Sequence, residues 1–166
     1  TLIAILDTGV ESNHEDLRDN YVSINTSYDR DVRGHGTHCA GIAAAVTGNN
    51  IGIASLLPSK SNIKVTSIKV LSNFGFGAQH QIIAGMIEAS DKGADVISMS
   101  LGAPSNPDRE KTYNEAVKYA NAQGAIVVVA AGNSNADAAQ YSPANTPGVI
   151  AVAAINQNLK KASFSN

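Results

Sequence analysis

Three short motifs place reactive side chains beside glycines. Asp7 opens an Asp-Thr-Gly sequence, His35 stands between two glycines, and Asn133 follows an Ala-Ala-Gly sequence. A carboxylate at the tip of a buried strand needs a hydrogen-bonding or charged partner, because its desolvation is costly. An imidazole flanked by glycines can be approached closely by backbone or substrate, which suits a general base at a cleft. An amide at a strand end can donate a hydrogen bond to a developing oxyanion.

Each motif also has a simpler interpretation. Asp7 and Asn133 are residue types common in caps and turns, where their side chains bond the local backbone. An aspartic protease is excluded, because its chemistry needs two carboxylates that share a proton and the sequence holds one Asp-Thr-Gly. His35 and His38 fall on one helical face and could hold a metal ion, but the Glu of an HExxH motif is missing.

Two further segments could hold an extended peptide. Ser100-Leu101-Gly102 follows an apolar strand, and its small residues leave the backbone open for strand addition. Gly75-Phe76-Gly77 could flank the same peptide from the opposite side. Its two glycines also match part of a dinucleotide-binding fingerprint, but the third glycine of that motif is absent.

Apolar strands that alternate with helical segments must position these residues. The expected strands, all short and rich in β-branched residues, are residues 2–6, 63–68, 96–99, 126–130 and 149–152, and residues 21–27 alternate like a further edge strand. Helical spacing of apolar residues covers 35–46, 78–92 and 109–123. Near-continuous apolar strands indicate burial on both faces, so we predict an α/β fold with a doubly wound, mainly parallel sheet and helices on both faces. Such sheets gather their sites at the carboxyl ends of the strands.

Length and charge narrow the possible classes of protein. Residues 1–166 are expected to form a single domain, since the length fits one domain and no repeat or linker divides it. A net charge of -2 offers no basic face, so no nucleic acid partner is expected. No apolar run approaches the roughly 18 residues of a membrane span, so no membrane partner is expected either. Thr1 leads straight into an apolar strand and the sequence stops without a terminal element, so we expect both ends to be cut or processed.

Taken in order along the chain, the motifs resemble those of the subtilisin-like serine proteases, the subtilase family. The resemblance rests on Ile5-Leu6-Asp7-Thr8-Gly9-Val10, Gly34-His35-Gly36-Thr37-His38, residues 96–102, Ala130-Ala131-Gly132-Asn133, residues 149–154 and residues 162–165. It covers essentially the whole chain. It implies a subtilisin-like fold that is incomplete at its C-terminal side.

The resemblance implies a role for each matching residue. Asp7 would orient the imidazole of His35, and His35 would take the proton of a serine hydroxyl and pass it to the leaving amine. The Asn133 side chain would donate to the tetrahedral oxyanion. Segment 100–102 would bind the acyl side of the substrate and begin one wall of the specificity pocket. Ala130, Ala131 and Gly132 would form the other wall, Gly75 to Gly77 would be the opposite binding strand, and Ser142-Pro143 would be a cis peptide.

The sequence departs from the family pattern at the nucleophile. No Gly-Thr-Ser motif occurs, and Ser134 lies in the wrong context to replace it. The serine is therefore expected outside this chain, either on a C-terminal fragment of the same protease after autolysis or in the remainder of a truncated chain. Residues 1–166 alone are expected to be inactive. Cys39 is expected to be a small buried hydrophobe whose nearness to His35 predicts sensitivity to mercurials.

The resemblance further implies a secreted, extracellular endopeptidase that acts on protein or peptide substrates and has a propeptide inhibitor. It implies no cofactor for the chemistry. A structural calcium ion is implied as possible, with Asp16 and Asn49 as the ligand candidates. A non-catalytic pseudoprotease or peptide-binding domain is the alternative that the absent serine supports. A nucleotide-binding α/β domain fits the fold but not the combination of Asp7, His35 and Asn133.

Overall fold

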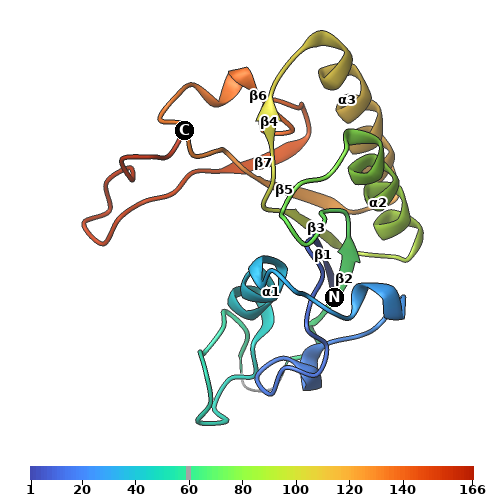
Figure 1. Ribbon diagram of the computed structural model, residues 1–166, viewed down its shortest axis with the longest axis vertical. Coiled ribbons are helices and arrows are strands. Elements are labelled where there is room, and N and C mark those ends of the chain that lie inside the picture. The colour runs from blue at the N-terminus through green and yellow to red at the C-terminus, as the bar shows by residue number, and fades with distance from the viewer. Residues whose placement is uncertain (59–60) are drawn as a thin grey trace.

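Five parallel strands form the central sheet of the computed structural model, which describes residues 1–58 and 61–166 (Figure 1). The strands are β1 (Leu2–Asp7), β2 (Lys64–Lys69), β3 (Val96–Met99), β5 (Ile126–Ala130) and β7 (Val149–Val152). They lie in the order β2-β1-β3-β5-β7, so the chain first moves outward to β2 and then back across β1 to β3. The five strands expected from the apolar runs are confirmed. Sites in such sheets lie outside the carboxyl ends of the strands, where the order reverses.

Helices cover both faces of this sheet, which confirms the predicted α/β architecture. Helix α1 (His35–Ala44) packs on β1 and β2 from one side, while α2 (Gln79–Asp91) and α3 (Pro107–Ala122) cover the other side (Figure 1). The remaining elements are a short antiparallel pair, β4 (Ala103–Pro104) with β6 (Tyr141–Ser142), and 3₁₀ turns at Arg18–Asn20, Thr26–Tyr28 and Ala138–Gln140. Among the described residues, no helix is both long and apolar enough to cross a membrane.

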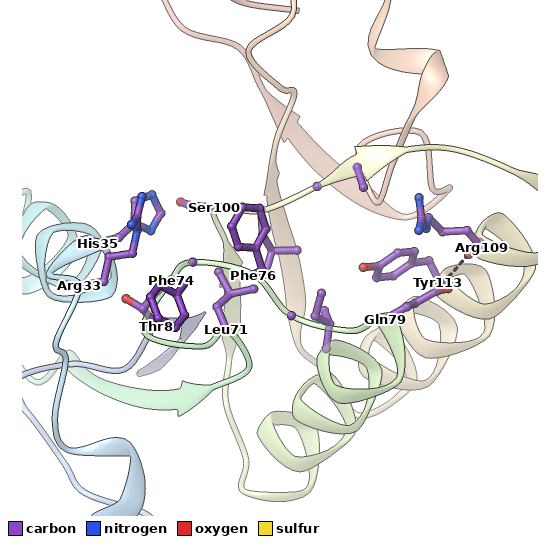
Figure 2. A pocket seen from close by; sticks show the side chains of 16 residues that line it. Thr8, Arg33, His35, Leu71, Phe74, Phe76, Gln79, Ser100, Arg109 and Tyr113 are labelled. Atoms are coloured by element: carbon purple, nitrogen blue, oxygen red, sulfur yellow. Dashed lines mark hydrogen bonds between the residues drawn. The ribbon is translucent and has the colours of Figure 1, made fainter.

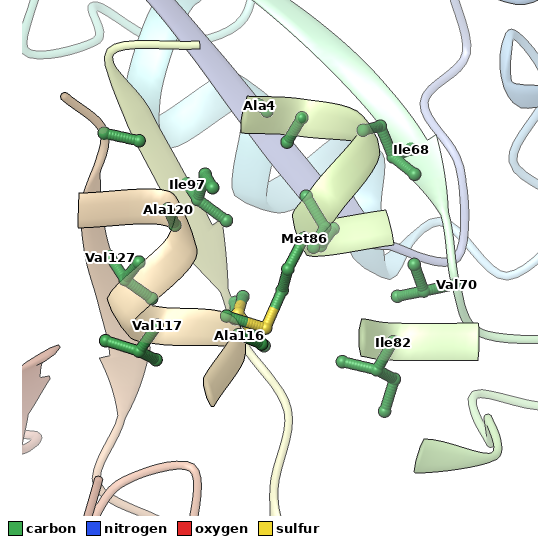
Figure 3. Packing of buried hydrophobic residues seen from close by; sticks show 14 of the residues in the cluster. Ala4, Ile68, Val70, Ile82, Met86, Ile97, Ala116, Val117, Ala120 and Val127 are labelled. Atoms are coloured by element: carbon green, nitrogen blue, oxygen red, sulfur yellow. The ribbon is translucent and has the colours of Figure 1, made fainter. Parts of the chain in front are cut away.

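The larger core lies between the sheet and the pair of helices α2 and α3. Met86 of α2 is fully buried and contributes to the same cluster as Ile97 of β3 and Val117 of α3 (Figure 3). Burying each such side chain stabilises the fold by about 1.5–3 kcal/mol. Gly85 lets α2 approach the sheet closely, because a Cβ at this position would collide with Val70. This packing fixes the strands whose carboxyl ends carry the candidate site.

Local signals in the sequence explain where the helices begin and end. Helix α3 begins two residues earlier than predicted, because the Asn106 side chain accepts the N–H of Arg109 at 2.9 Å and Pro107 suits the first turn. Gly93 and Gly124 follow α2 and α3 with φ values of 77° and 92°, a left-handed conformation that side chains disfavour.

The expected edge strand at residues 21–27 is wrong for most of its length. Tyr21 alone forms a parallel bridge, to Val65, and residues 26–28 form a 3₁₀ turn. The Asn25 side chain caps this turn by accepting the N–H of Ser27 at 3.0 Å. A local hydrogen bond of this kind competes with strand pairing, and alternation of apolar residues does not reveal it.

One face of the sheet is covered only in part. Helix α1 covers β1 and β2, whereas Ile126 and Ile150 on the same side of β5 and β7 are 51% and 54% exposed. Beside α1 this surface forms a groove of about 510 Å³ that Ile42, Val128 and Val152 help to line. We call this surface, formed by Ile42, Ile126, Val128, Ile150 and Val152, the open sheet face. Apolar area of this kind normally lies against another element.

Candidate active site

Asp7 and His35 form a hydrogen-bonded pair at the carboxyl edge of the sheet. Asp7 is the last residue of β1 and is 1% exposed, while His35 opens α1 with its side chain 47% exposed. The His35 Nδ1 lies 2.7 Å from the Asp7 Oδ1, and this oxygen also accepts the N–H of Thr8 at 2.7 Å. A buried carboxylate on Nδ1 fixes the imidazole orientation and leaves Nε2 free for proton transfer. The structure thus brings together two of the three predicted catalytic residues.

A network of polar side chains locks the start of α1 against the end of β1. The Thr8 hydroxyl donates to the Asp31 Oδ1 at 2.8 Å and accepts the N–H of Gly36 at 3.1 Å. The other oxygen of Asp31 accepts both the N–H and the hydroxyl of Thr37, at 2.9 and 2.8 Å. Burial alone would raise the pKa of Asp31, but these hydrogen bonds outweigh it and lower the pKa. The network therefore holds His35 in register with Asp7.

Glycine is required at position 36 because the start of α1 lies directly against the end of β1. A Cβ at Gly36 would collide with the carbonyl oxygen of Gly9 and lie 3.1 Å from the Cβ of Asp7. Gly34, immediately before the helix, has φ of 85°, so the chain turns sharply into α1. Gly36 thus allows α1 to lie close to the end of β1, and Gly34 allows the chain to turn into α1.

Asn133 lies at the end of β5 in a loop that another segment ties down. The N–H groups of Ser134 and Ala136 donate to the Asn166 Oδ1 at 2.8 and 3.1 Å, and the Asn166 Nδ2 donates to the Ala131 carbonyl at 3.0 Å. The side chain of Asn133 is exposed and faces the groove of the open sheet face. Its amide is therefore available to an outside acceptor at the same sheet edge as Asp7.

The two predicted peptide-binding segments lie on opposite sides of one cavity of about 400 Å³ (Figure 2). Gly75, Phe76 and Gly77 line one side, and Ser100, Leu101 and Gly102 line the other. His35 stands at one end, and Arg109 and Tyr113 lie at the other (Figure 2). We call this cavity the cleft. Its volume and the two backbone segments that flank it suit an extended peptide.

A second cavity of about 430 Å³ adjoins the first along segment 100–102. Ala130, Ala131, Gly132 and Asn133 form its other wall, as the resemblance implies for a specificity pocket. No charged side chain belongs to its described lining. The Ser142-Pro143 peptide beside it is cis, as expected. This pocket suits an uncharged side chain.

Cys39 lies one helical turn after His35. One ligand atom from each of Asp7, His35 and Cys39 lies within 4.8 Å of the others, and the Cys39 Sγ is 3.5 Å from the Ser100 Oγ. Burial raises the pKa of the thiol. The predicted proximity of Cys39 to His35 is confirmed, but the expected burial is not complete, because Cys39 packs against the core only partly buried. His38 instead lines a different cavity, beside Asp16, so the described residues do not combine His35 with His38 in a metal site.

The calcium candidates Asp16 and Asn49 are neighbours. The Asp16 Oδ1 accepts the Asn49 amide at 2.8 Å, its Oδ2 accepts the N–H of Ile53 at 2.9 Å, and the Asn49 oxygen accepts the N–H of Ile51 at 3.1 Å. Calcium takes six to eight oxygens. In this arrangement each of these side-chain oxygens already accepts one N–H donor, so a calcium ion bound here would share or replace those contacts.

Several residues that organise the site carry little local signal in the sequence. Asp31 and Thr37 are polar residues in loop and helix, and only the fold reveals that they bond each other behind His35. Asn166 is 33 positions beyond Asn133, so its contact with that loop depends on tertiary structure. Arg33 and Arg109 line the cleft without belonging to a motif. The local signal for this network in the sequence is Asp31, which lies three residues before the Gly34-His35-Gly36 motif.

A parallel α/β sheet that pairs a buried carboxylate with a histidine at its carboxyl edge is an arrangement typical of hydrolases with a histidine base. A family model described as the subtilase family matches residues 1–166, and the chain belongs to this family. It is 45% identical to thermitase from Thermoactinomyces vulgaris over 168 residues and 41% identical to subtilisin DY from Bacillus licheniformis over 171 residues. These alignments take in 98% and 99% of this chain but 58% and 60% of the relatives.

Solved structures agree with this assignment. A protease from Pseudoalteromonas arctica aligns with a TM-score of 0.87 at 33% identity, and sphericase aligns with a TM-score of 0.84 at 35% identity. The matches cover 100% and 99% of this chain, and 59% and 58% of the respective solved chains. The chain therefore spans about three fifths of the length of these relatives.

Proposed function

We propose that this chain is the front part of a secreted serine endopeptidase that hydrolyses peptide bonds by acyl transfer. The observation that carries the proposal is the 2.7 Å contact between the buried Asp7 carboxylate and the exposed His35 imidazole, at one end of a peptide-sized cleft. In this proposal the extended substrate binds between segments 75–77 and 100–102. Its side chain before the cleaved bond enters the uncharged pocket formed by residues 130–132.

The proposed acyl transfer follows from the Asp7–His35 pair. His35 takes the proton of the attacking serine and returns it to the leaving amine, while Asp7 stabilises the imidazolium that forms. Asn133 donates to the oxyanion of the tetrahedral intermediate. No cofactor takes part in these steps. A structural calcium ion at Asp16 and Asn49 stays a prediction, which a chelator-induced fall in the melting temperature would support.

The nucleophilic serine is proposed to lie on a segment beyond residue 166 that packs on the open sheet face. This face is apolar and half exposed at Ile126, Ile150 and Val152. Its groove runs to Ser100 and Asn133, so a segment docked there would reach the catalytic edge. The relatives are longer than this chain by about two fifths of their own length, which is enough to supply such a segment. Secretion and a propeptide inhibitor belong to the same proposal.

A non-catalytic peptide-binding domain is the second candidate, because no Gly-Thr-Ser motif occurs in these residues. Labelling of the full-length protein with a fluorophosphonate decides between the two. An endopeptidase is labelled, and the His35→Ala variant loses the label because the serine is no longer activated. His38→Ala is the matched control, since His38 lies on the same helix but lines another cavity. Full-length protein that folds and takes no label would support the peptide-binding domain.

A further inference from the structure

The permanently charged side chains that line the cleft are both positive. Sixteen described residues line it, and among them Arg33 and Arg109 are the charged side chains besides the titratable His35, with no Asp or Glu (Figure 2). No carboxylate in residues 1–58 and 61–166 lies within 4.0 Å of either guanidinium. Two unneutralised guanidinium groups in one cavity create a positive field that attracts carboxylates.

Arg33 lies at the catalytic end of the cleft. It precedes His35 by two residues (Figure 2), and its exposed side chain lies against Gly75. A Cβ at Gly75 would lie 2.9 Å from the Arg33 Nε, so the guanidinium rests directly against one of the two proposed peptide-binding segments. A peptide paired with that segment would pass close to this charge.

Arg109 lies at the opposite end. It belongs to the first turn of α3, is partly buried, and donates from Nη1 to the carbonyl of Pro104. Its own carbonyl accepts the Gln79 amide at 3.1 Å, which links α3 to the start of α2 (Figure 2). These contacts hold the Arg109 side chain at the cleft. Its acidic neighbour Glu110 is engaged elsewhere, by Ser105 at 2.8 Å and Asn145 at 3.0 Å.

Acidic groups behind the catalytic end are also engaged. Asp7 bonds His35, and Asp31 accepts three hydrogen bonds from Thr8 and Thr37. Neither carboxylate belongs to the lining of the cleft. Because these anions face inward and the arginines face the cavity, the two guanidinium groups are the charges that a bound peptide can contact directly.

We propose that the cleft selects peptide substrates that carry an acidic side chain on the acyl side of the cleaved bond. This selection rests on the proposed function, and it adds a charge preference to it. Arg33 binds a substrate carboxylate near the cleaved bond, and Arg109 binds one farther along the peptide. The residue directly before the bond stays uncharged, because its pocket has no charged lining.

The test uses the full-length protein and acetylated peptides that keep one uncharged residue before the cleaved bond. Glu is compared with Gln at the second, third and fourth residues before that bond. At low ionic strength kcat/KM for Glu is expected to exceed that for Gln by about threefold to fivefold at one or more positions, the size of a partly exposed ion pair. The preference is expected to disappear in about 1 M salt.

Two variants and a control test whether Arg33 and Arg109 cause the preference for Glu over Gln. Arg33→Gln is expected to abolish it at the position nearer the bond, and Arg109→Gln at the farther one. Arg18→Gln is the matched control, since Arg18 is an exposed arginine beside Asp19 outside the cleft. Equal kcat/KM for Glu and Gln at every position, or a preference that survives both variants, would overturn the proposal.

A binding measurement separates this proposal from the proposed function. The full-length His35→Ala variant is titrated with fluorescently labelled Glu and Gln peptides, and Kd is read by anisotropy. A threefold to fivefold tighter Kd for Glu supports the charge preference even if the protein takes no fluorophosphonate label. Equal Kd values together with fluorophosphonate labelling of the wild type would refute the preference and leave the protease function intact.

Discussion

The carboxamide of Asn166 accepts the N–H of Ser134 at 2.8 Å, and so ties the loop that carries Asn133 to a segment 33 residues away in sequence. The same side chain also bonds Ala136 and Ala131. Three hydrogen bonds from one amide hold the backbone on both sides of Asn133. The position of the proposed oxyanion donor therefore depends on a residue that does not touch the oxyanion.

Replacing Asn166 by alanine is expected to loosen this loop. Loss of three hydrogen bonds, two of them partly buried, should lower the free energy of unfolding by about 1–3 kcal/mol. Amide hydrogen exchange at Ser134 and Ala136 should accelerate, while the amides of α2 keep their protection. In the full-length enzyme kcat should fall more than KM rises. Unchanged exchange at both amides would show that the loop does not depend on Asn166.

Asn133→Ala is expected to lower kcat by about 10²–10³ with little change in KM, because the amide is proposed to act on the oxyanion of the transition state. This range is the one known for removing such a donor from subtilisin itself. The steady-state kinetics of the full-length enzyme provide the measurement. A large rise in KM at constant kcat would assign Asn133 to substrate binding instead.

Asp31→Asn is expected to destabilise the junction between β1 and α1. Hydrogen bonds from Thr37 and Thr8 lower the pKa of Asp31 below its usual 3.8 despite the opposing effect of burial. A depressed pKa means that Asp31 contributes stability at pH values above 3.8, and that this contribution is lost as the pH falls through the folded-state pKa. Because Asp31 is partly exposed, solvent screens this contribution, and the variant should lower the free energy of unfolding by about 1 kcal/mol at neutral pH.

Urea unfolding at several pH values checks this prediction. The difference between wild type and Asp31→Asn should shrink as the pH is lowered below the usual value of 3.8. Asp19→Asn is the control, because Asp19 is exposed and its contact with Arg18 should be worth less than about 1 kcal/mol. A constant difference across the pH range would mean that the charge of Asp31 does not matter.

Cys39 is expected to react slowly with charged thiol reagents at neutral pH. Burial raises the pKa of the thiol, and the nearby charges of Asp7 and Asp31 add to this effect while Ser100 opposes it. The reaction rate should keep rising above pH 9, the usual thiol pKa. A small organomercurial should reach Cys39 and block fluorophosphonate labelling of the full-length enzyme, because the modified sulfur would crowd His35. Cys39→Ala should be insensitive, and a sensitive Cys39→Ala would place the effect elsewhere.

The sequence by itself determined the architecture and indicated the residues that we propose to be reactive. Runs such as Ile126–Ala130 are apolar on both faces and too short for helices, which favours parallel strands, although the Ile126 side of β5 stays half exposed on the open sheet face. Asp7 and His35 were recognisable because each sits in a short glycine-containing motif, and in a parallel sheet the ends of such strands meet at one edge. Helix ends at Gly93 and Gly124 followed from local backbone preference.

Tertiary structure alone decided which distant side chains support these residues and which charged side chains line the cleft. The bonds of Asp31 to Thr8 and Thr37, and of Asn166 to the Asn133 loop, join positions whose proximity no periodicity encodes. Residues 21–27 alternate like a strand, yet a local side-chain cap turned part of them into a 3₁₀ turn. Arg33 and Arg109 are unremarkable in sequence and become partners in one cavity because α1 and α3 pack at opposite ends of it. Local patterns depend on neighbouring residues, whereas charge in a cavity depends on how separate elements pack.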